Sequence, residues 1–335
     1  MDKENFISVA NNLRLKNKTF FPFPIYLAVD KKYETKCKTN ETIELCYNKN
    51  KVCNFLIKSK YKFNFNEKKK IGKKLYKTNS IKHPGYLYFK NESGLYLSGK
   101  IFNFNKDILK NINFSSPKKI KNKIKPLQKI VGFHTRNVPH RGHEWIHSFG
   151  IKKCNNILIQ PIVGHFKKGE YSEKTVINAN KYLVKKNNFE NSKKKISQKY
   201  FFSFINIYPK YAGPREALFH ALIRKNYGCT HFLVGRDHAG YKDFYNEYDS
   251  QKLCIKYQKK LKIKILKFKS PKICKFCKII TNRKCSCKYS KNKNSLIDIN
   301  GSSIRKLIAN KKKVYSYLMN EEIYQNLKGK YILHK

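Results

Sequence analysis

Between residues 126 and 267, apolar strand-like runs alternate with helical stretches, and this alternation constrains the fold more than any other feature of the chain. The strand-like runs are KIVGF (129–133), NILIQPIVG (156–164), YFFSFINIY (200–208), HFLVG (231–235) and LKIKILKF (261–268). Strands that alternate with helices predict a parallel sheet with crossover helices. We therefore expect an α/β domain over residues 126–267.

The regions on either side follow other patterns. Over residues 1–125, short alternating runs such as FPIYLAV (23–29), GYLYF (85–89) and LYLSGKIFNF (95–104) predict a small β-rich domain. Residues 268–335 form a small C-terminal region with a cysteine cluster and a helical end.

The segment GLYLSGKI (94–101) nearly matches a phosphate-binding loop. Its last position lacks the hydroxyl that Mg²⁺ needs, and its alternation predicts a strand.

The composition limits the class of protein. The chain has 335 residues, a hydrophobic fraction of 40% and a formal net charge of +53. That hydrophobic content excludes a disordered chain. The excess lysine is scattered and accompanies other residues with A/T-rich codons, which favours genomic composition over a localised nucleic-acid-binding face. We expect nucleic acid to be bound only non-specifically.

The sequence predicts neither a membrane anchor nor a disulfide framework. No apolar stretch approaches the roughly 20 residues that cross a bilayer, and the N-terminus lacks the apolar core of a secretory signal. We expect a cytoplasmic protein without membrane association. Six dispersed cysteines are interpreted as structural thiols: Cys37, Cys46, Cys53, Cys154, Cys229 and Cys254.

HTRNVPHRGH, residues 134–143, follows the first strand of the predicted sheet. The carboxyl ends of parallel strands are where open α/β sheets bind ligands. Pro139 suits the first turn of a helix, which would place His140 and His143 on one helical face beside free backbone N–H groups. Such a helix start binds anions. The alternatives for an isolated HxxH are two satisfied histidines or part of a metal site.

A second segment, residues 211–240, repeats the arrangement with the letters YAGPREALFHALIRKNYGCTHFLVGRDHAG. It predicts a helix over 215–226, then a strand, then the loop GRDHAG at the carboxyl end of that strand. Two anion-binding loops in one sheet indicate a nucleotide site.

These motifs resemble those of the ATP sulfurylase (sulfate adenylyltransferase) family. The family's (Q)TRNxxHxxH signature is matched by residues 134–143, its YAGPREA and GRDHAG blocks by 211–217 and 235–240, and its SGTxxR element loosely by NGSSIR (300–305). Residues 19–30 resemble part of the family's PUA-like domain. The resemblance implies a Rossmann-like nucleotidyltransferase sheet preceded by a PUA-like domain, here with a shortened start.

The resemblance also implies a reaction and its residues. In the family, a sulfate oxygen attacks the α-phosphorus of ATP in line, and pyrophosphate leaves as adenosine 5′-phosphosulfate forms. Mg²⁺ would arrive with ATP. Carried over by position, the catalytic residues are Thr135, Arg136, Asn137, His140 and His143; the nucleotide-binding residues are His134, Arg136, Asn137, Gly235, Arg236, Asp237 and His238; and the sulfate-binding residues are His134, Arg136 and Ala239.

His134 departs from the glutamine that is usual in the family. A neutral imidazole has one donor and one acceptor, whereas a protonated ring has two donors and a charge. The sequence leaves open which form faces the site.

The remaining cysteines have metal-ligand spacing. Cys274, Cys277, Cys285 and Cys287 read C-x2-C-x7-C-x-C, which favours a structural four-thiolate zinc site. Reduced thiols without a metal are the alternative.

Two other functions remain open at this stage. One is a degenerate or repurposed nucleotidyltransferase-fold protein that binds nucleic acid through its basic surface. The other is a nucleotidyltransferase with a different acceptor, since HRGH also resembles the wider superfamily's signature. We also expect a homo-oligomer.

Overall fold

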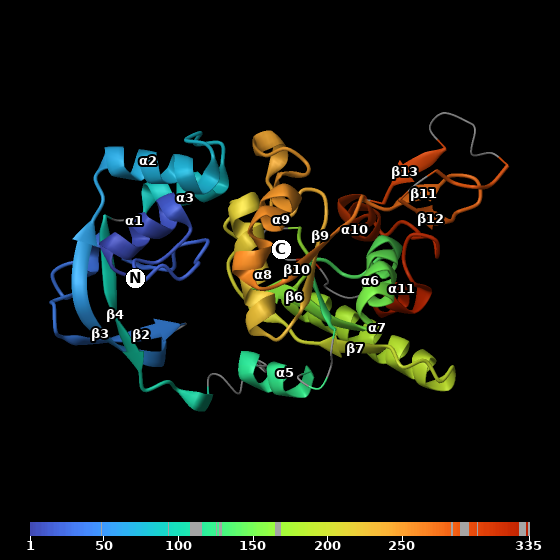
Figure 1. Ribbon diagram of the computed structural model, residues 1–335, viewed down its shortest axis with the longest axis horizontal. Helices are drawn as coiled ribbons and strands as arrows, with labels where there is room; N and C mark the ends of the chain where they lie inside the picture. The colour runs from blue at the N-terminus through green and yellow to red at the C-terminus, as the bar shows by residue number, and fades with distance from the viewer. Residues whose placement is uncertain are drawn as a thin grey trace. The chain divides into compact units, whose positions relative to one another are not determined.

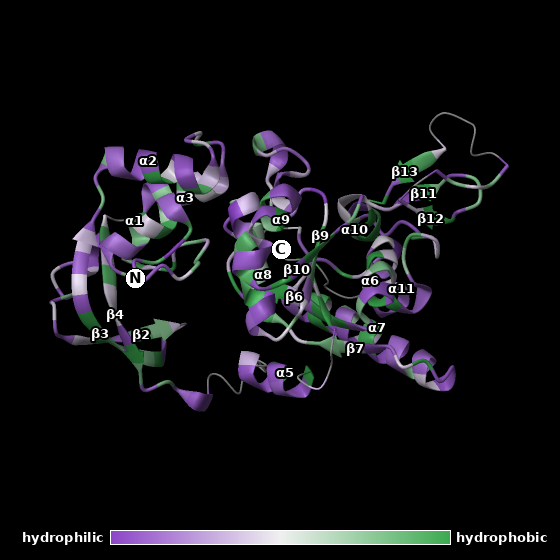
Figure 2. Cartoon of the chain, in the orientation of Figure 1, coloured by the Kyte–Doolittle hydropathy of each residue, from purple (hydrophilic) through white to green (hydrophobic). Residues whose placement is uncertain are grey.

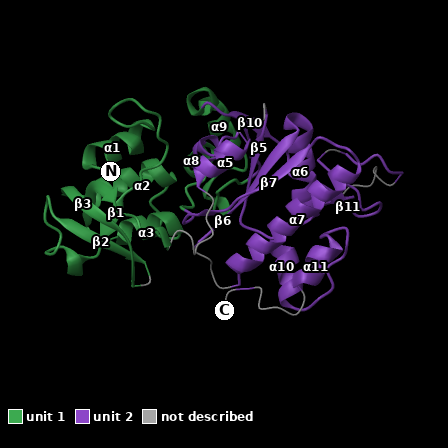
Figure 3. Ribbon diagram, turned by 90° about the horizontal axis from the view of Figure 1, so that it is seen from below, with its two compact units in different colours: residues 1–114, 210–221, 237–261 green, residues 115–209, 222–236, 262–335 purple. Residues whose placement is uncertain are grey.

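The computed structural model describes residues 1–47, 49–92, 94–107, 116–124, 126, 129–164, 169–282, 284–288, 295–299, 301–327 and 333. It divides into two compact units (Figure 3). Unit 1 comprises residues 1–114, 210–221 and 237–261, and unit 2 comprises residues 115–209, 222–236 and 262–335. The chain therefore passes between the units several times, and each unit is described by itself. The boundaries predicted after residues 125 and 267 stay predictions.

Unit 1 is built on a four-stranded antiparallel sheet with the order β1-β4-β3-β2 (Figure 1). Its elements are α1 (Lys3–Asn12), β1 (Leu27–Val29), β2 (Thr42–Tyr47), β3 (Asn50–Lys62), α2 (Phe65–Tyr76), α3 (Pro84–Asn91), β4 (Leu95–Phe102) and α9 (Asp249–Leu261). Leu95 and Leu97 of β4 pack in one apolar cluster, whereas Tyr96 packs in an aromatic cluster with Phe6 and Phe89. This period of two confirms the strand predicted over the near-P-loop sequence.

GYLYF was predicted as a strand, and that prediction was wrong: it forms helix α3. Pro84 occupies the first turn, and Nδ1 of His83 accepts the N–H of Tyr86 at 3.1 Å, so the helix start is capped. Tyr86 and Phe89, three residues apart, are both buried in the aromatic cluster. The apolar residues thus satisfy a helical period as well as an alternating one.

Unit 2 contains the predicted parallel sheet, with the order β10-β9-β5-β6-β7 and β8 paired to β6 (Figure 1). The pairings between its described strands are parallel. The strands are β5 (Val131–Thr135), β6 (Asn156–Val163), β7 (Lys199–Phe202), β8 (Ile205–Asn206), β9 (His231–Val234) and β10 (Lys264–Lys267). Every residue of β6 is buried, and the strand is largely hydrophobic (Figure 2). This is the pattern of a central parallel strand.

Helices precede β5 or connect successive strands of this sheet. They are α5 (Pro117–Ile124), α6 (Arg141–Cys154), α7 (Glu173–Lys193) and α8 (Pro214–Asn226), the last of which crosses the boundary between the units after residue 221. Ile146 of α6 and Val184 of α7 pack with Phe133 of β5. Gly132, on the opposite face of β5, lies against Arg224 of α8. Residues 131, 133 and 135 therefore face α6, and residues 132 and 134 face α8.

The C-terminal part of unit 2 is a small three-stranded sheet and two helices. Its elements are β11 (Lys272–Cys274), β12 (Ile280–Thr281), β13 (Leu296–Asp298), α10 (Gly301–Ala309) and α11 (Glu321–Leu327). Ile304 of α10 and Ile323 of α11 pack with Val176 of α7 in one apolar cluster. This packing brings the C-terminal helices to the end of the sheet where β5 finishes, because Val138 belongs to the same cluster.

Candidate active site

The loops after β5 and β9 leave the same edge of the parallel sheet. The two strands are neighbours, with Val131 opposite His231 and Gly132 opposite Phe232. His134 and Thr135 are the last two residues of β5, and residues 136–143 and the predicted pair Gly235 and Arg236 therefore follow the carboxyl ends of adjacent strands within unit 2. This is the position at which open α/β sheets bind ligands.

The loop after β5 is held in place by side chains of its own unit. Oγ1 of Thr135 accepts the N–H of Asn137 at 3.0 Å, and Nδ2 of Asn180 on α7 donates to the Asn137 carbonyl at 3.2 Å. Nη2 of Arg136 lies 2.9 Å from a carboxylate oxygen of Glu170, and both side chains are about a quarter exposed. The loop and the Arg136 guanidinium are therefore positioned by the protein itself.

His140 and His143 lie together, as the sequence predicted. Their rings stack with centroids 3.8 Å apart, and the rings of Phe133 and His143 form a T-shaped pair with centroids 5.5 Å apart. Burial lowers the pKa of His140 well below its ordinary value, and it lowers the pKa of His143 to about 4. Both rings are therefore neutral at neutral pH.

The two neutral rings have hydrogen-bonding capacity that the described residues do not use. Nδ1 of His140 and Nδ1 of His143 are buried and have no hydrogen-bond partner among the described parts of the chain. A buried polar atom without a partner is costly, so such atoms are commonly the ones that meet a ligand.

The start of α6 differs from the prediction. Pro139 precedes the helix, His140 is its N-cap, and Arg141 is its first residue. The N–H of Arg141 donates to the Leu318 carbonyl at 2.8 Å, so this group is not free for an anion. One of the backbone N–H groups expected to be free is thus engaged, because the segment before α11 packs against the helix start.

His147 was missed by the sequence analysis. It lies one turn after His143 on α6, is 1% exposed, and its ring forms a T-shaped pair with Phe133 at a centroid distance of 4.5 Å. Neither ring nitrogen has a partner among the described residues. Burial lowers its pKa well below the ordinary value, and the neighbouring His143 lowers it further. The spacing HxxHxxxH (140, 143 and 147) was the available signal.

Gly301 of the predicted element NGSSIR lies beside His140 and Asn137. A Cβ built on Gly301 would lie 3.5 Å from Nε2 of His140 and 3.7 Å from the Asn137 side chain. The first residue of NGSSIR, residue 300, lies outside the described residues, and the Arg305 guanidinium lies over the Tyr171 ring at 5.9 Å. The first turn of α10 thus borders the histidine pair.

The GRDHAG loop is divided between the units. In unit 2, Gly235 passes close to Phe268, since a Cβ there would lie 2.8 Å from the ring. In unit 1, the Ala239 carbonyl accepts the N–H of Gly213 at 3.0 Å, which joins the two predicted blocks. Asp237 and Ala239 have positive φ values of 50° and 60°. These strained positions shape the loop.

His238 belongs to a short polar chain within unit 1. Its Nε2 is 3.1 Å from Nδ1 of His220, and Nε2 of His220 is 3.6 Å from a carboxylate oxygen of Glu216. Oγ of Ser250 donates to the His238 carbonyl at 2.8 Å. His220 therefore contacts the His238 ring and orients it. The sequence alone did not indicate His220.

The YAGPREA block also has a structural role. The carboxylate of Glu216 accepts the N–H groups of Lys210 and Ala212, and the Arg215 guanidinium donates to the carbonyls of Val9 and Ala10 at 2.8 and 3.1 Å. The buried charges of this block therefore hold its own loop and helix α1.

The four predicted cysteine ligands converge. The sulfur atoms of the four cysteines all lie within 4.8 Å of one another, with 3.8 Å between Cys274 and Cys287 and 3.4 Å between Cys277 and Cys285. Tetrahedral Zn–S bonds of about 2.3 Å separate the sulfurs by about 3.8 Å. The backbone N–H groups of Cys277 and Phe276 lower the pKa of Cys274 to about 6 against an opposing desolvation effect. The cluster can therefore hold a metal ion.

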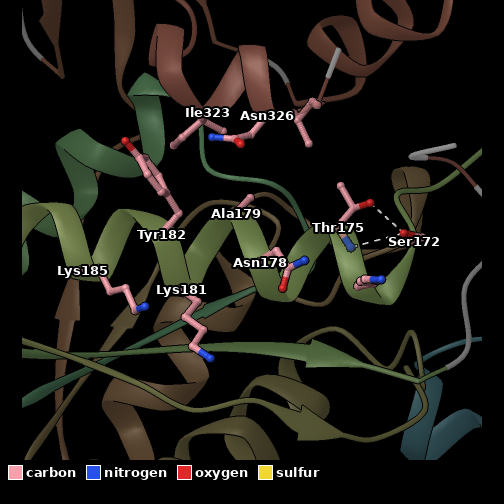
Figure 4. Close-up of a pocket in the computed structure, with 11 residues that line it drawn as sticks. Ser172, Thr175, Asn178, Ala179, Lys181, Tyr182, Lys185, Ile323 and Asn326 are labelled. Carbon is pink, nitrogen blue, oxygen red and sulfur yellow. Dashed lines mark hydrogen bonds between the residues drawn. The ribbon is translucent and has the colours of Figure 1, made fainter. Parts of the chain in front are cut away.

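A cavity of about 590 Å³ lies elsewhere, between α7 and α11 (Figure 4). Tyr182 and Ala179 point toward Ile323 across it, and Lys174, Lys181 and Lys185 lie on its α7 side. None of the predicted site residues lines this cavity, so it is not part of the candidate site.

None of the described helices has the length and apolarity that crossing a membrane requires.

The fold and the site define an α/β nucleotide-binding protein of the nucleotidyltransferase kind, with two candidate loops at one sheet edge and a neutral histidine pair. The chain belongs to the ATP-sulfurylase family, whose model matches residues 113–330. The model of a PUA-like domain matches residues 1–106. The fold class predicted from the sequence is confirmed.

Curated relatives agree with this assignment. Sulfate adenylyltransferase of Persephonella marina is 30% identical over 92% of this chain and 78% of its own length. The protein of the same name from Pyrococcus abyssi is 29% identical over 98% and 83%. A solved structure, the hexameric APS kinase from Thiobacillus denitrificans, matches with a TM-score of 0.63 at 14% identity, and it covers 98% of this chain and 57% of that one. That likeness concerns the fold alone.

Proposed function

We propose that this chain is a sulfate adenylyltransferase, which converts ATP and sulfate to adenosine 5′-phosphosulfate and pyrophosphate. The observation that carries the proposal is the stacked pair His140 and His143, with unused buried nitrogens, at the sheet edge where the family's signature loop lies. The relatives that are named sulfate adenylyltransferase match nearly the whole chain. They give no support to a repurposed nucleic-acid-binding protein.

In the proposed reaction, a sulfate oxygen forms a bond to the α-phosphorus while the bond from that phosphorus to the bridging β-phosphate oxygen breaks. No bond to the enzyme forms, so the residues position the reactants and stabilise charge. Arg136 contacts sulfate and the α-phosphate. His140 donates an N–H group to the phosphates as pyrophosphate acquires charge, and the stacked His143 ring, whose N–H bonds to the Val138 backbone, supports it. Thr135 and Asn137 keep this loop in shape.

The second loop holds the other end of the reactants. Gly235, Arg236, Asp237 and His238 bind the nucleotide, and the backbone at Ala239 contacts sulfate. Gly235 suits a close approach of backbone and ligand because it has no side chain. Mg²⁺ comes with ATP and would offset charge on its phosphates.

Exchange of labelled pyrophosphate into ATP tests the proposal. The purified protein should catalyse this exchange only when sulfate is present, because pyrophosphate re-enters ATP only after the sulfate adduct has formed. Exchange that needs a different acceptor in place of sulfate would assign the chain to another nucleotidyltransferase. Absence of exchange with any acceptor would contradict an enzymatic role.

We further propose that the four-cysteine cluster holds one structural zinc ion. Four thiolates complete a tetrahedral shell, so they leave no open position for chemistry. A cytoplasmic location and a homo-oligomeric state are also proposed, and size-exclusion chromatography with light scattering tests the oligomeric state.

A further inference from the structure

We propose that Arg224 is a positioning residue that fixes His134 as the tautomer with its proton on Nε2, so that this chain offers an imidazole N–H where the family pattern has a glutamine amide. The proposal rests on the proposed function in one respect, namely that His134 meets the anionic substrate. The Arg224–His134 contact itself is independent of it.

The contact is a short one between two strands and a helix of unit 2. Nη2 of Arg224 is 2.9 Å from Nδ1 of His134 and 3.0 Å from the carbonyl oxygen of Gln160. His134 and Gln160 are opposite each other in the register of β5 and β6. One guanidinium nitrogen therefore contacts both strands at the same level of the sheet.

The path of the Arg224 side chain is set by Gly132. Residues 132 and 134 face α8, and a Cβ on Gly132 would lie 2.7 Å from Cγ of Arg224. Glycine at 132 thus leaves the space through which the Arg224 side chain crosses β5 to His134. The glycine at 132 and the buried Arg224 thus act together to place the guanidinium against His134.

The chemistry of arginine decides the protonation of the histidine. A guanidinium has only donors, so the nitrogen it meets must accept. Arg224 is fully buried, and although burial lowers its pKa to about 10, it stays charged at neutral pH. Nδ1 of His134 consequently carries no proton, and the single proton of the neutral ring is on Nε2.

The same contact fixes the orientation of the ring. Turning the imidazole by half a turn would replace Nδ1 with a C–H group, and the Arg224 donor would lose its acceptor. The N–H of the His134 ring is therefore on Nε2, and the proposed donor role assigns this group to the substrate. A glutamine at this position would keep both functions, since its carbonyl oxygen accepts and its amide donates.

Nitrogen-15 NMR of histidine-labelled protein tests the tautomer directly. The chain has 10 histidines, and the His134 signals are those lost in His134→Gln. We expect Nδ1 of His134 to resonate as an unprotonated nitrogen and Nε2 as a protonated one at pH 7.5. A protonated Nδ1, alone or together with Nε2, would overturn the proposal.

Variants of Arg224 separate positioning from general stability. Arg224→Lys keeps a charged donor, and we expect it to keep the tautomer, whereas Arg224→Met should release it and give a mixture. Unfolding temperatures report any general damage. If Arg224→Met is folded and His134 keeps one tautomer, Arg224 does not set it; if the variant does not fold, the spectra of the natural protein and of Arg224→Lys still decide.

Kinetics test the donor role. His134→Gln should change the KM for sulfate less than about threefold, and His134→Leu should raise it about tenfold or more, because only the second removes the N–H donor. Equal KM values in all three proteins would overturn the donor role. Absence of sulfate-dependent exchange in the natural protein would instead contradict the proposed function. The NMR result would still decide whether Arg224 fixes the tautomer.

Discussion

At the scale of single residues, the site divides positive charge from hydrogen-bond donation. In the proposed mechanism Arg136 and Arg236 supply charge, whereas the histidines of α6 are kept neutral by burial. A neutral imidazole does not hold ATP by charge before the reaction. It acts most strongly on oxygens that become more negative during the reaction, because the strength of its hydrogen bond rises with that charge.

His140→Ala and His143→Ala should therefore each lower kcat by about 10²-fold, with a smaller rise in the KM for ATP. Steady-state rates of pyrophosphate exchange measure both parameters. His231→Asn is a matched control, because His231 begins β9 at the opposite edge of the sheet. Equal losses in binding and turnover would show that the pair merely supports the structure.

The same histidines predict how stability depends on pH. Their pKa values in the folded protein lie below the ordinary value near 6.5 that the unfolded chain has, with His143 at about 4. Between these values the unfolded chain binds more protons, so stability falls as the pH is lowered from about 6.5 to 4 and does not depend on these groups above that range. For His143 alone, the loss by pH 4 is at most roughly 3 kcal/mol.

His147→Asn isolates this effect from that of the carboxylates. His147 is buried, its pKa is lowered well below the ordinary value, and it is outside the proposed catalytic set. Urea unfolding at pH 7.5 and at pH 5.0 should give a smaller difference in stability for the variant than for the natural protein. An identical difference would mean that His147 is not buried as a neutral ring.

At the scale of elements, the sequence pattern predicted most of unit 2 because apolar runs that alternate with helical stretches carry a clear signal. All five apolar runs became strands, although the third divides into β7 and β8 at residues 203–204. GYLYF failed because five apolar residues fit both a strand and a buried helix, and only the cap at His83 decides. The candidate loops were placed at strand ends correctly.

Residues that act through a tertiary contact could not be found in this way. Arg224 looks like an ordinary charged residue near the end of a helix, and only the pairing of β5 with β6 and the space above Gly132 bring it to His134. The use of the Arg141 N–H by Leu318 depends on chain 177 residues further on, and no local pattern records it.

The cysteine element carries its own prediction. Purified protein should contain about one zinc per chain, and Cys274→Ser should lower both the zinc content and the unfolding temperature without changing the KM for sulfate. Cys46→Ser is the matched control, because Cys46 is exposed and lies in β2 of unit 1. Full stability of a zinc-free Cys274→Ser protein would remove the metal site.

At the scale of the whole molecule, the net charge of +53 determines how the protein interacts with polyanions. The described carboxylates are few, and several of them are engaged with lysine or arginine partners, such as Asp249 with Lys77 and Glu170 with Arg136. The positive charge is thus spread over both units and is little offset. A diffuse charge attracts nucleic acid without reading its sequence.

We therefore expect DNA to bind weakly and without preference. Affinity should fall by orders of magnitude between low and physiological salt, because release of counterions drives the binding, and duplexes of different sequence should bind alike. Fluorescence anisotropy over a salt series, with several duplexes and a single strand, measures both properties. Saturating sulfate and ATP should leave DNA binding almost unchanged, since the charge is not concentrated at the proposed site. Selective binding that persists at physiological salt would favour a nucleic-acid-binding role, and displacement of DNA by ATP alone would place that role at the sheet edge.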